Sequence, residues 1–506
     1  MKSNLRDSRC ANGTCAVNAF SIRERVTSPA SLWLRRVLVG LLVGTVGLVV
    51  TIESCRAAAT TLVVPANTPH GTEDWGDPDA MDWQAVIEKT MRPFAGVSHP
   101  GVNTKTLTGK VMSGYQGWFA APNDGAGRGW VHWGSRGRFE PGLCKIDLWP
   151  DVSELDSDER HATPFVHPDG RKAEVFSSFH RKTVLRHFEW MKTYGLDGVF
   201  VQRFINSPND VKGYRHVNVV LNHCREGANL SGRTYAVMYD LSGLGTGQMH
   251  RVIEDWKLLV DRMHITKDPA YLHHGGKPVV AVWGLGFNDG RKYTLAEGLE
   301  LVKFWKDEPK YGGNTVMLGV PTYWRTLKQD CLGDKTLHEL ILKADIVSPW
   351  TVGRYATPEQ AMRYAELTIK PDLDWCREWK KELLPVVFPG FSWHNMNPRF
   401  PLHQIPRLKG KFLWTQYVQA KLAGATMVYQ AMFDEVDEGT AIFKCTDRPP
   451  VGASQFVDYE GLPSDFYLKL VGQATRMVRG EFGVTEEFPG ESGGGLLGSP
   501  VTPLVK

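Results

Sequence analysis

Short apolar runs alternate along the chain with longer amphipathic stretches. Eight runs rich in apolar and β-branched residues predict strands, and they lie at 111–116, 198–202, 234–239, 278–283, 315–320, 345–349, 384–388 and 425–430. A polar or Gly-rich turn follows each run, and then a segment with apolar residues at helical spacing. Apolar runs without polar alternation are typical of parallel strands that helices cover.

The helical segments complete the pattern. In 180–194, Val184, Phe188 and Met191 recur at helical spacing, and Gly195 is a suitable C-terminal stop. Eight strands alternating with helices, the last helix at 464–479, predict an α/β fold, a single (β/α)8 TIM-type barrel with long strand-end loops. The rival, an open doubly wound sheet, usually has a phosphate-binding Gly motif after its first strand, and the chain lacks one there.

The two ends of the chain differ in composition from the predicted barrel. An uncharged apolar stretch at 37–52 follows an arginine pair and precedes three alanines, which is the layout of a secretory signal. An uncleaved anchor that tethers the protein to a membrane is the alternative, although the 16 residues of this stretch fall short of the roughly 20 needed to span a bilayer. We therefore expect an exported protein, periplasmic, on the cell surface or extracellular. The predicted parts are a signal peptide or transmembrane anchor at 1–59, an irregular lead-in at 60–105, the barrel at 106–482 and a disordered Gly/Pro-rich tail at 483–506.

Charge and cysteine content narrow the function classes. The formal charge of +4 comes from residues 1–59, since 51 basic residues face 52 acidic ones in the rest of the chain. A body this close to neutrality has no electrostatic reason to bind nucleic acid. No Cys-x-x-Cys pair occurs, so no zinc site is indicated, and we expect neither a metal nor a cofactor.

Aromatic and polar residues follow almost every predicted strand. The carboxyl ends of barrel strands meet at one face, where barrel enzymes hold their active sites. Sugars have apolar C–H faces and rings of hydroxyls, which suit aromatic rings flanked by polar groups. For Arg203 and Asp240, a structural ion pair at the barrel mouth is the equal alternative. The predicted substrate-binding residues are Tyr115, Trp118, Arg203, Asp240, Trp283, Tyr323, Trp350, Trp393, His394 and Asp437.

Four carboxylates, Asp434, Glu435, Asp437 and Glu438, follow the last predicted strand. A solvated loop is the ordinary interpretation of such a run. Here, however, the run lies between two apolar segments at the functional end of a strand. Crowded carboxylates have pKa values that move apart, which allows one to act as an acid and another as a base. Gly439 permits the turn that would bring two of them to one side.

The acidic segment and the predicted barrel both resemble known protein families. Glu-x-x-Glu-Gly-Thr at 435–440 is similar to the catalytic segment of glycoside hydrolase family 99, the endo-α-mannosidase and endo-mannanase group. The stretch from about 110 to 479 resembles the bacterial family 71/99-like proteins. The motifs that carry this resemblance are GYQGWF at 114–119, FEPG and IDLWPD around 139–151, FEWMKTYGLDGVFVQRF at 188–204, VMYDLSG at 237–243, PGFSWHNM at 389–396 and FDEVDEGTAIF at 433–443.

The resemblance implies a retaining glycosidase that acts on a poly- or oligosaccharide. Glu438 would be the general acid/base, and Glu435 would deprotonate the 2-hydroxyl of the sugar. The fallback has Glu435 as the nucleophile of the ordinary two-carboxylate scheme. Val436 and Asp437 stand where family 99 typically has Trp and His, so mannose specificity is not carried over.

Two other functions compete with a glycosidase. A metal-dependent barrel hydrolase usually has His-x-His near its first strand, and GYQGW has none. A catalytically inactive carbohydrate-binding barrel at the cell surface is the stronger alternative. Such a barrel would bind sugars through the aromatic residues at the strand ends and would not need both Glu435 and Glu438. The sequence does not indicate an oligomeric state.

Overall fold

A computed structural model of the protein describes residues 74–205 and 210–489, and its strands form a barrel. Strands lie within or beside all eight predicted runs, which confirms the fold class. The barrel strands are β1 (Val111–Tyr115), β4 (Gly198–Phe204), β5 (Thr234–Asp240), β7 (Lys277–Trp283), β8 (Thr315–Pro321), β9 (Ile346–Trp350), β10 (Glu382–Leu383), β11 (Val386–Val387) and β12 (Val428–Gln430).

The seventh predicted strand consists of the two short pieces β10 and β11. Pro385 lies between them and has no N–H to donate to a neighbouring strand. The strand order is β10-β9-β8-β7-β5-β4-β1-β12-β11, and all these neighbours are parallel. Because β10 and β11 are nearly continuous in the chain, the two ends of this order meet and the sheet closes on itself.

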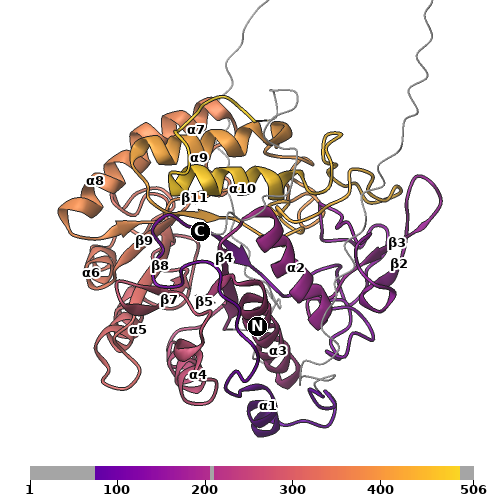
Figure 1. The fold of residues 1–506 in the computed structure, drawn as a ribbon, viewed down its shortest axis with the longest axis horizontal. Coiled ribbons are helices and arrows are strands. Elements are labelled where there is room, and N and C mark those ends of the chain that lie inside the picture. Colours follow the sequence, from indigo (N-terminus) through magenta and orange to yellow (C-terminus); the bar gives the residue numbers. More distant parts are fainter. Residues whose placement is uncertain (1–73, 206–209, 490–506) are drawn as a thin grey trace, which may run out of the picture. The chain divides into compact units, whose positions relative to one another are not determined.

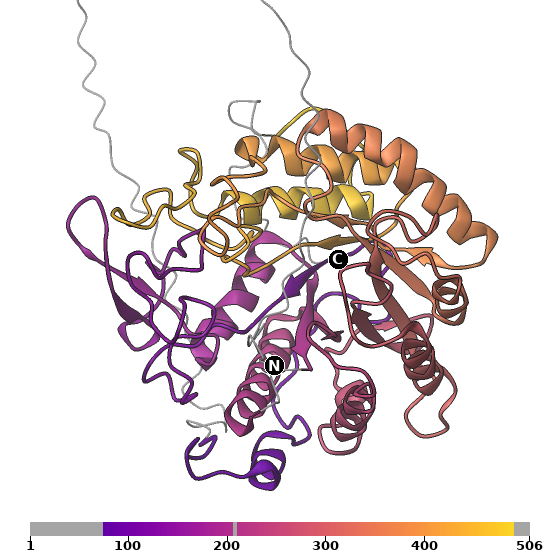
Figure 2. The same cartoon turned by 180° about the vertical axis from the view of Figure 1, so that it is seen from behind.

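Helices surround the strands, as Figures 1 and 2 show. Helix α2 ends at Gly195, whose φ of 84° is the left-handed stop that the sequence predicted. Helices α7, α9 and α10 lie next to one another on one side. The helices are α1 (Trp83–Thr90), α2 (Arg181–Tyr194), α3 (Val211–Ser231), α4 (His250–Asp261), α5 (Leu295–Asp307), α6 (Thr336–Lys343), α7 (Pro358–Tyr364), the π-helical turn Ala365–Ile369, α8 (Lys370–Glu378), α9 (Lys411–Ala423) and α10 (Phe466–Arg479).

The long segment between β1 and α2 forms a subdomain beside the barrel (Figure 1). We call residues 117–175 the insert. It contains an antiparallel hairpin, β2 (His161–Val166) and β3 (Lys172–Val175). Buried aromatic rings fill its interior, with Phe139 stacked on Trp149 at 5.7 Å between ring centroids. The backbone amides of Asp147 and Leu148 donate to the Val436 carbonyl, so the insert is joined directly to the acidic segment.

The predicted signal segment at 1–59 and most of the tail lie outside the described residues. Within 74–205 and 210–489, no helix has the length and apolar character to cross a bilayer. The regular barrel elements run from β1 to α10, inside the predicted range of 106–482.

Candidate active site

The acidic segment after β12 is buried, so the solvated-loop interpretation does not apply. Asp434, Glu435 and Asp437 are 0%, 4% and 1% exposed, and Glu438 is half-buried. The apolar residues on both sides of the segment are almost inaccessible to solvent and hold it inside the molecule. Burying charge is costly unless it is compensated, so these carboxyls must share protons or accept hydrogen bonds.

Gly439 makes the turn that folds the segment back. Its φ is 64°, and a Cβ added there would lie 3.0 Å from the Ser392 backbone nitrogen. The Arg407 guanidinium donates to the carbonyls of Gly439 and Ala441, at 2.8 Å each. Arg407 is itself buried, with the Tyr467 ring 4.5 Å from its Cζ. The predicted turn at Gly439 is therefore present and is held from outside.

Asp434 connects the segment to the first strand. Its carboxylate accepts hydrogen bonds from the amides of Gln116 at 2.7 Å and Gly117 at 2.9 Å. Burial raises the pKa of Asp434 to about 7, against the lowering effect of these two bonds. Asp434 therefore positions the loop after β1 beside the segment.

Glu435 is held by two side-chain donors. The Gln116 amide donates to one carboxyl oxygen, and the Thr440 hydroxyl donates to the other at 2.6 Å. Burial, together with the charges of Glu438 and Asp437, raises the pKa of Glu435 well above its ordinary value. Glu435 and Glu438 therefore lie close enough to interact electrostatically.

Glu438 is the half-buried member of the segment. Within the described part of the chain, its carboxyl group has no hydrogen-bond partner, while the Ser392 amide donates to its backbone carbonyl at 3.0 Å. Burial, and after it Asp437 and Asp240, raise the pKa of Glu438 to about 8. Burial and the neighbouring negative charges therefore both favour the protonated form of this carboxyl. The effect of Asp240 also places this predicted residue, at the end of β5, near Glu438.

Asp437 contacts the insert. Its Oδ2 lies 3.0 Å from Nδ1 of His132. The His132 ring stacks on Trp118, with centroids 3.7 Å apart and an angle of 5° between the planes. The predicted residues Trp118 and Asp437 are thus joined through His132, which the sequence interpretation missed because the insert has no periodicity.

Two further predicted aromatics lie at the mouth of the barrel. Trp283 and Trp350 are in edge-to-face contact at 5.6 Å, and Trp350 contacts Tyr429 at 6.2 Å. The Tyr429 hydroxyl accepts a hydrogen bond from the Gln202 amide at 3.0 Å. Burial raises the pKa of Tyr429, and the charge of Glu435 adds to this effect. These rings are therefore connected to the carboxylates through Tyr429.

Trp393 and His394 lie in the loop after β11, which Asp147 of the insert organises. Asp147 accepts hydrogen bonds from the Ser392 hydroxyl at 2.5 Å and from the backbone amide of His394 at 2.7 Å. His394 Nδ1 donates to the Phe400 carbonyl at 2.8 Å. The Ser392 amide bonds to the Glu438 backbone, so this loop borders the acid even though the His394 ring is engaged elsewhere.

For three predicted residues, the described hydrogen bonds and ion pairs are made with groups other than Glu435 and Glu438. Tyr115 is 0% exposed, and its hydroxyl lies 2.9 Å from His187 of α2. Tyr323 is tied by its backbone amide to Asp330. Arg203 contacts residues of α3 and α4.

Arg203 pairs with Asp255 of α4 at 2.6 Å and with Asn218 of α3 at 2.7 Å, so its guanidinium points toward the helices. Of the two roles predicted for Arg203, a substrate contact and a structural ion pair, the geometry favours the ion pair, and its partner is Asp255, not Asp240. The reason is strand alternation, because successive side chains point to opposite faces. Gln202 is the neighbour that points inward, and the pattern of alternation could have identified it.

Several buried polar atoms around the carboxylates have no partner within the described residues. Such atoms are rare in folded proteins and require an explanation, for which a hydroxyl-rich ligand is suitable. These atoms include both hydrogen-bond donors and acceptors, and a ligand's hydroxyl groups can pair with both kinds. They are the indole N–H groups of Trp118, Trp283 and Trp393, Oε1 of Gln116 and Oδ1 of Asp437.

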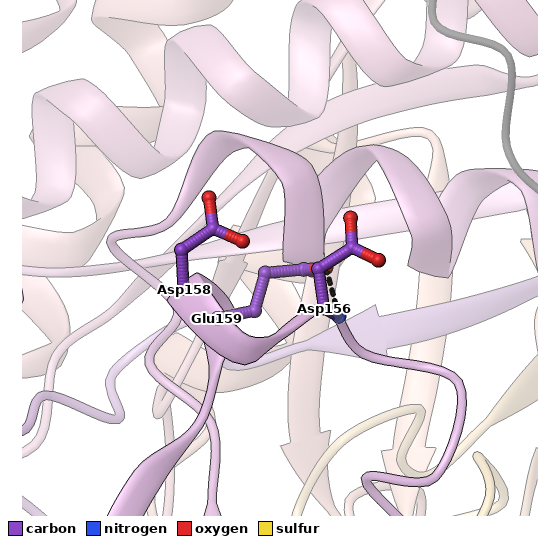
Figure 3. Close-up of side chains that lie close together, drawn as sticks. All are labelled: Asp156, Asp158 and Glu159. Atoms are coloured by element: carbon purple, nitrogen blue, oxygen red, sulfur yellow. Dashed lines mark hydrogen bonds between the residues drawn. The ribbon is translucent and has the colours of Figure 1, made fainter.

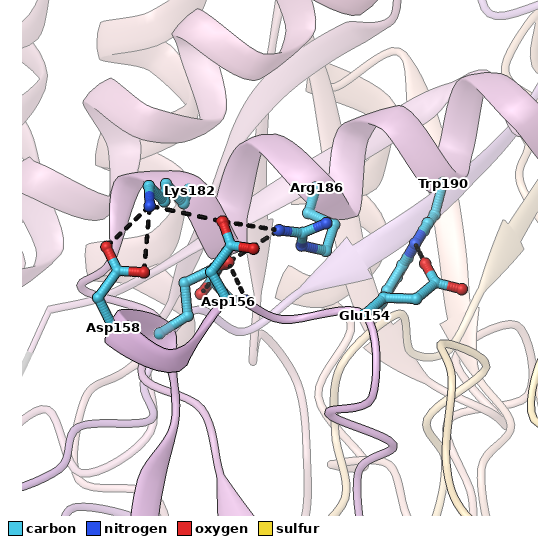
Figure 4. Close-up of polar contacts among 8 residues, drawn as sticks. Glu154, Asp156, Asp158, Lys182, Arg186 and Trp190 are labelled. Atoms are coloured by element: carbon cyan, nitrogen blue, oxygen red, sulfur yellow. Dashed lines mark hydrogen bonds and ion pairs between the residues drawn. The ribbon is translucent and has the colours of Figure 1, made fainter. Parts of the chain in front are cut away.

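One acidic cluster in the described residues has the spacing of a metal site. Figure 3 shows Asp156, Asp158 and Glu159 close together at the edge of the insert. Lys182 lies 2.8 Å from Asp158, and Arg186 lies 2.8 Å from Glu159, both extending from α2 (Figure 4). Two cationic side chains already neutralise these carboxylates, so the cluster joins the insert to α2 and gives no reason to infer a metal ion.

Comparison with known proteins supports the fold. No protein-family model and no curated protein matches this chain. Two solved structures of the GH99 endo-α-mannosidase from Bacteroides thetaiotaomicron are similar to it, with 18% and 19% identity and TM-scores of 0.51 and 0.52. Each covers 74% of this chain and 98% of its own length, and one contains bis-tris-propane. The chain shares the fold of these GH99 structures. At this level of identity the likeness shows the fold, and the chemistry must be argued from the residues.

Proposed function

We propose that the protein is an exported retaining glycoside hydrolase of poly- or oligosaccharides, with Glu438 as general acid/base and Glu435 as its carboxylate partner. One observation carries this proposal. Two carboxyl groups, Glu435 and Glu438, lie in a largely buried segment past the last barrel strand, where burial and neighbouring negative charge raise the pKa of both. Such a pair is what glycosidic bond cleavage requires.

The hydrogen bonds favour this division of roles. Glu435 accepts from Gln116 and Thr440, and both bonds stabilise its ionised form. Glu438 has no such donor in the described residues. The two bonds to Glu435 favour its ionised form, against the raising effect of burial and of the charges of Glu438 and Asp437 on its pKa. Glu438 keeps its proton for the glycosidic oxygen, and its carboxylate later accepts a proton from the attacking water.

Two reaction courses remain for Glu435. It either removes the proton of the sugar 2-hydroxyl, whose oxygen then attacks the anomeric carbon, or attacks that carbon itself. The first course gives an anhydro-sugar intermediate, and the second gives a glycosyl ester. Both invert the anomeric centre twice, so both predict products that retain the configuration of the substrate.

The aromatic side chains support a carbohydrate as the substrate. Trp118 and Trp350 are half-buried rings, and buried polar atoms without partners in the described residues lie on Trp118, Trp283, Gln116 and Asp437. Because the similar solved structures are endo-α-mannosidases, α-linked mannans are the first substrates to test. Xylans and arabinans belong in the same panel, because Asp437 departs from the family 99 pattern.

The decisive experiment is a hydrolysis assay on this panel. We expect the wild type to cleave one class, and Glu438→Gln and Glu435→Gln to be at least about 100-fold slower. Asp372→Asn, a buried carboxylate paired with Arg325, is the matched control and should stay active. Undiminished cleavage by either glutamine variant contradicts the assignment. Glycan binding without cleavage would identify an inactive carbohydrate-binding barrel.

Export is a separate part of the proposal. The apolar segment 37–52, with basic residues before it and small residues after it, supports secretion. Fractionation of cells that express the full chain, with N-terminal sequencing of the product, distinguishes a cleaved signal from a retained anchor. A full-length product confined to the cytoplasm would contradict export.

A further inference from the structure

His132 is placed at the candidate site by an unusual backbone conformation. Its φ is 63°, in the left-handed region that non-glycine residues seldom adopt. The preceding residue, Val131, pairs with Ala120 across the first turn of the insert. This arrangement puts the half-buried imidazole flat against Trp118 and directs Nδ1 toward Asp437. Left-handed non-glycine residues often mark functional sites, where the surrounding structure compensates for their cost.

The partner of His132 is an almost fully buried carboxylate. Oδ2 of Asp437 lies 3.0 Å from Nδ1 of His132, whereas Oδ1 is buried with no partner in the described residues. Burial, with Lys145 and Arg128, lowers the pKa of His132 well below its ordinary value. The lowered pKa favours a neutral imidazole, which contacts Asp437 without cancelling a negative charge on that carboxyl.

Asp437 and Glu438 together are surrounded by more negative than positive groups. The acidic segment itself contributes three carboxyls, β5 contributes one, and the insert contributes one carboxyl and the cation Lys145. Burial raises the pKa of Asp437 to about 7, and Lys145 acts in the opposite direction. The titratable and charged groups facing Asp437 and Glu438 are Asp434, Glu435, Asp240, Asp147, Lys145 and His132, with Arg128 behind the imidazole.

We propose that Asp437, oriented by His132 on the Trp118 ring, is a positioning residue that keeps the proton on Glu438 before the glycosidic bond breaks. This inference rests on the proposed function, since it assigns Glu438 as the acid. An ionised Asp437 beside Glu438 makes a second negative charge unfavourable, so Glu438 holds its proton. When Glu438 gives that proton to the leaving oxygen, both groups are anionic. The same repulsion then favours return of a proton from the attacking water.

A carboxyl titration tests this without any substrate. In the full-length protein labelled with 13C at the glutamate side-chain carboxyls, the Glu438 resonance is the one that Glu438→Gln removes. In Asp437→Asn we expect the Glu438 titration midpoint to fall by about one pH unit, because a neighbouring like charge is gone. His132→Phe should shift it in the same direction, because Asp437 loses the donor that favours its ionised form. Asp372→Asn, whose carboxyl pKa burial also raises to about 7, is the matched control and should leave the midpoint unchanged.

An unchanged Glu438 midpoint in folded Asp437→Asn overturns the inference. If Asp437→Asn does not fold, an unchanged Glu438 midpoint in His132→Phe overturns the inference instead. The pH-rate profile on the substrate found in the hydrolysis panel is the second readout. Its alkaline limb should move down by about one pH unit in Asp437→Asn, whereas a purely structural defect lowers the rate equally at every pH. If Glu438→Gln cleaves normally, the proposed function fails, and the titration result still decides whether Asp437 acts on Glu438.

Discussion

The free energy of unfolding of the wild type should decrease as pH rises, because Glu438 is a half-buried acid. The Glu438→Gln variant should lack this contribution to the decrease. The pKa of Glu438 is raised in the folded protein from its ordinary value of 4.5 to about 8. Between these values the folded protein keeps a proton that the unfolded chain has released. The free energy of unfolding therefore decreases as pH rises through this window, and no further loss occurs above about pH 8.

The size of the effect follows from the width of that window. Each pH unit costs about 1.36 kcal/mol for one proton, and the window spans roughly 3.5 units, so the upper bound is about 5 kcal/mol. Glu438 is half-buried and shares its proton equilibrium with Glu435, and solvent screening reduces the effect. We therefore expect Glu438→Gln to gain about 2 kcal/mol relative to the wild type between pH 5 and pH 8.

Urea denaturation followed by tryptophan fluorescence measures this difference, and the chain has 17 Trp residues as probes. Midpoints and slopes would be recorded for both proteins at pH 5, 6, 7 and 8. Buried carboxyls far from Glu438 give the wild type and the variant the same background slope, so the difference reports Glu438 together with its effect on its coupled neighbour Glu435. Parallel curves for the two proteins across this range would refute the reasoning that Glu438 is a buried acid.

Three other predictions follow from the same structure. Arg203→Met should destabilise the protein by about 3–5 kcal/mol in the same denaturation assay at pH 7, because Asp255 loses its buried partner; a change below about 1 kcal/mol would contradict the structural ion pair. Gly439→Ala should lower the cleavage rate at least about tenfold, because its φ of 64° and its approach to Ser392 leave no room for a Cβ; wild-type kinetics would contradict it. Incubation with EDTA should leave cleavage unchanged, because the proposed chemistry uses carboxyl groups alone; inhibition reversed by a divalent cation would show otherwise.

The barrel could be predicted because its signal is local. Apolar runs bounded by turns mark the strands, and their number and alternation with helices determine the architecture. The acidic segment could be found in the same way, since it directly follows a strand. Even the split of the seventh strand has a local cause in Pro385, although the sequence interpretation placed one continuous strand there.

The partners of the acidic segment could not be predicted, because they depend on contacts between distant parts of the chain. His132 and Asp147 belong to the insert, which has no periodicity, yet they contact Asp437 and the loop at Ser392. Arg203 was chosen because it ends a strand, and the alternation of the strand directs it outward instead. The sequence therefore locates residues at the strand ends well, but it predicts poorly the face to which each side chain points.

The central claim is that Glu435 and Glu438 act on one glycosidic bond. A crystal structure of Glu438→Gln with an uncleaved oligosaccharide of the class identified in the hydrolysis assay tests it most directly. The account predicts that the glycosidic oxygen lies within hydrogen-bond distance of the amide at position 438, with Glu435 beside the 2-hydroxyl or the anomeric carbon of the same sugar. An oligosaccharide bound with its scissile bond away from both side chains would contradict it.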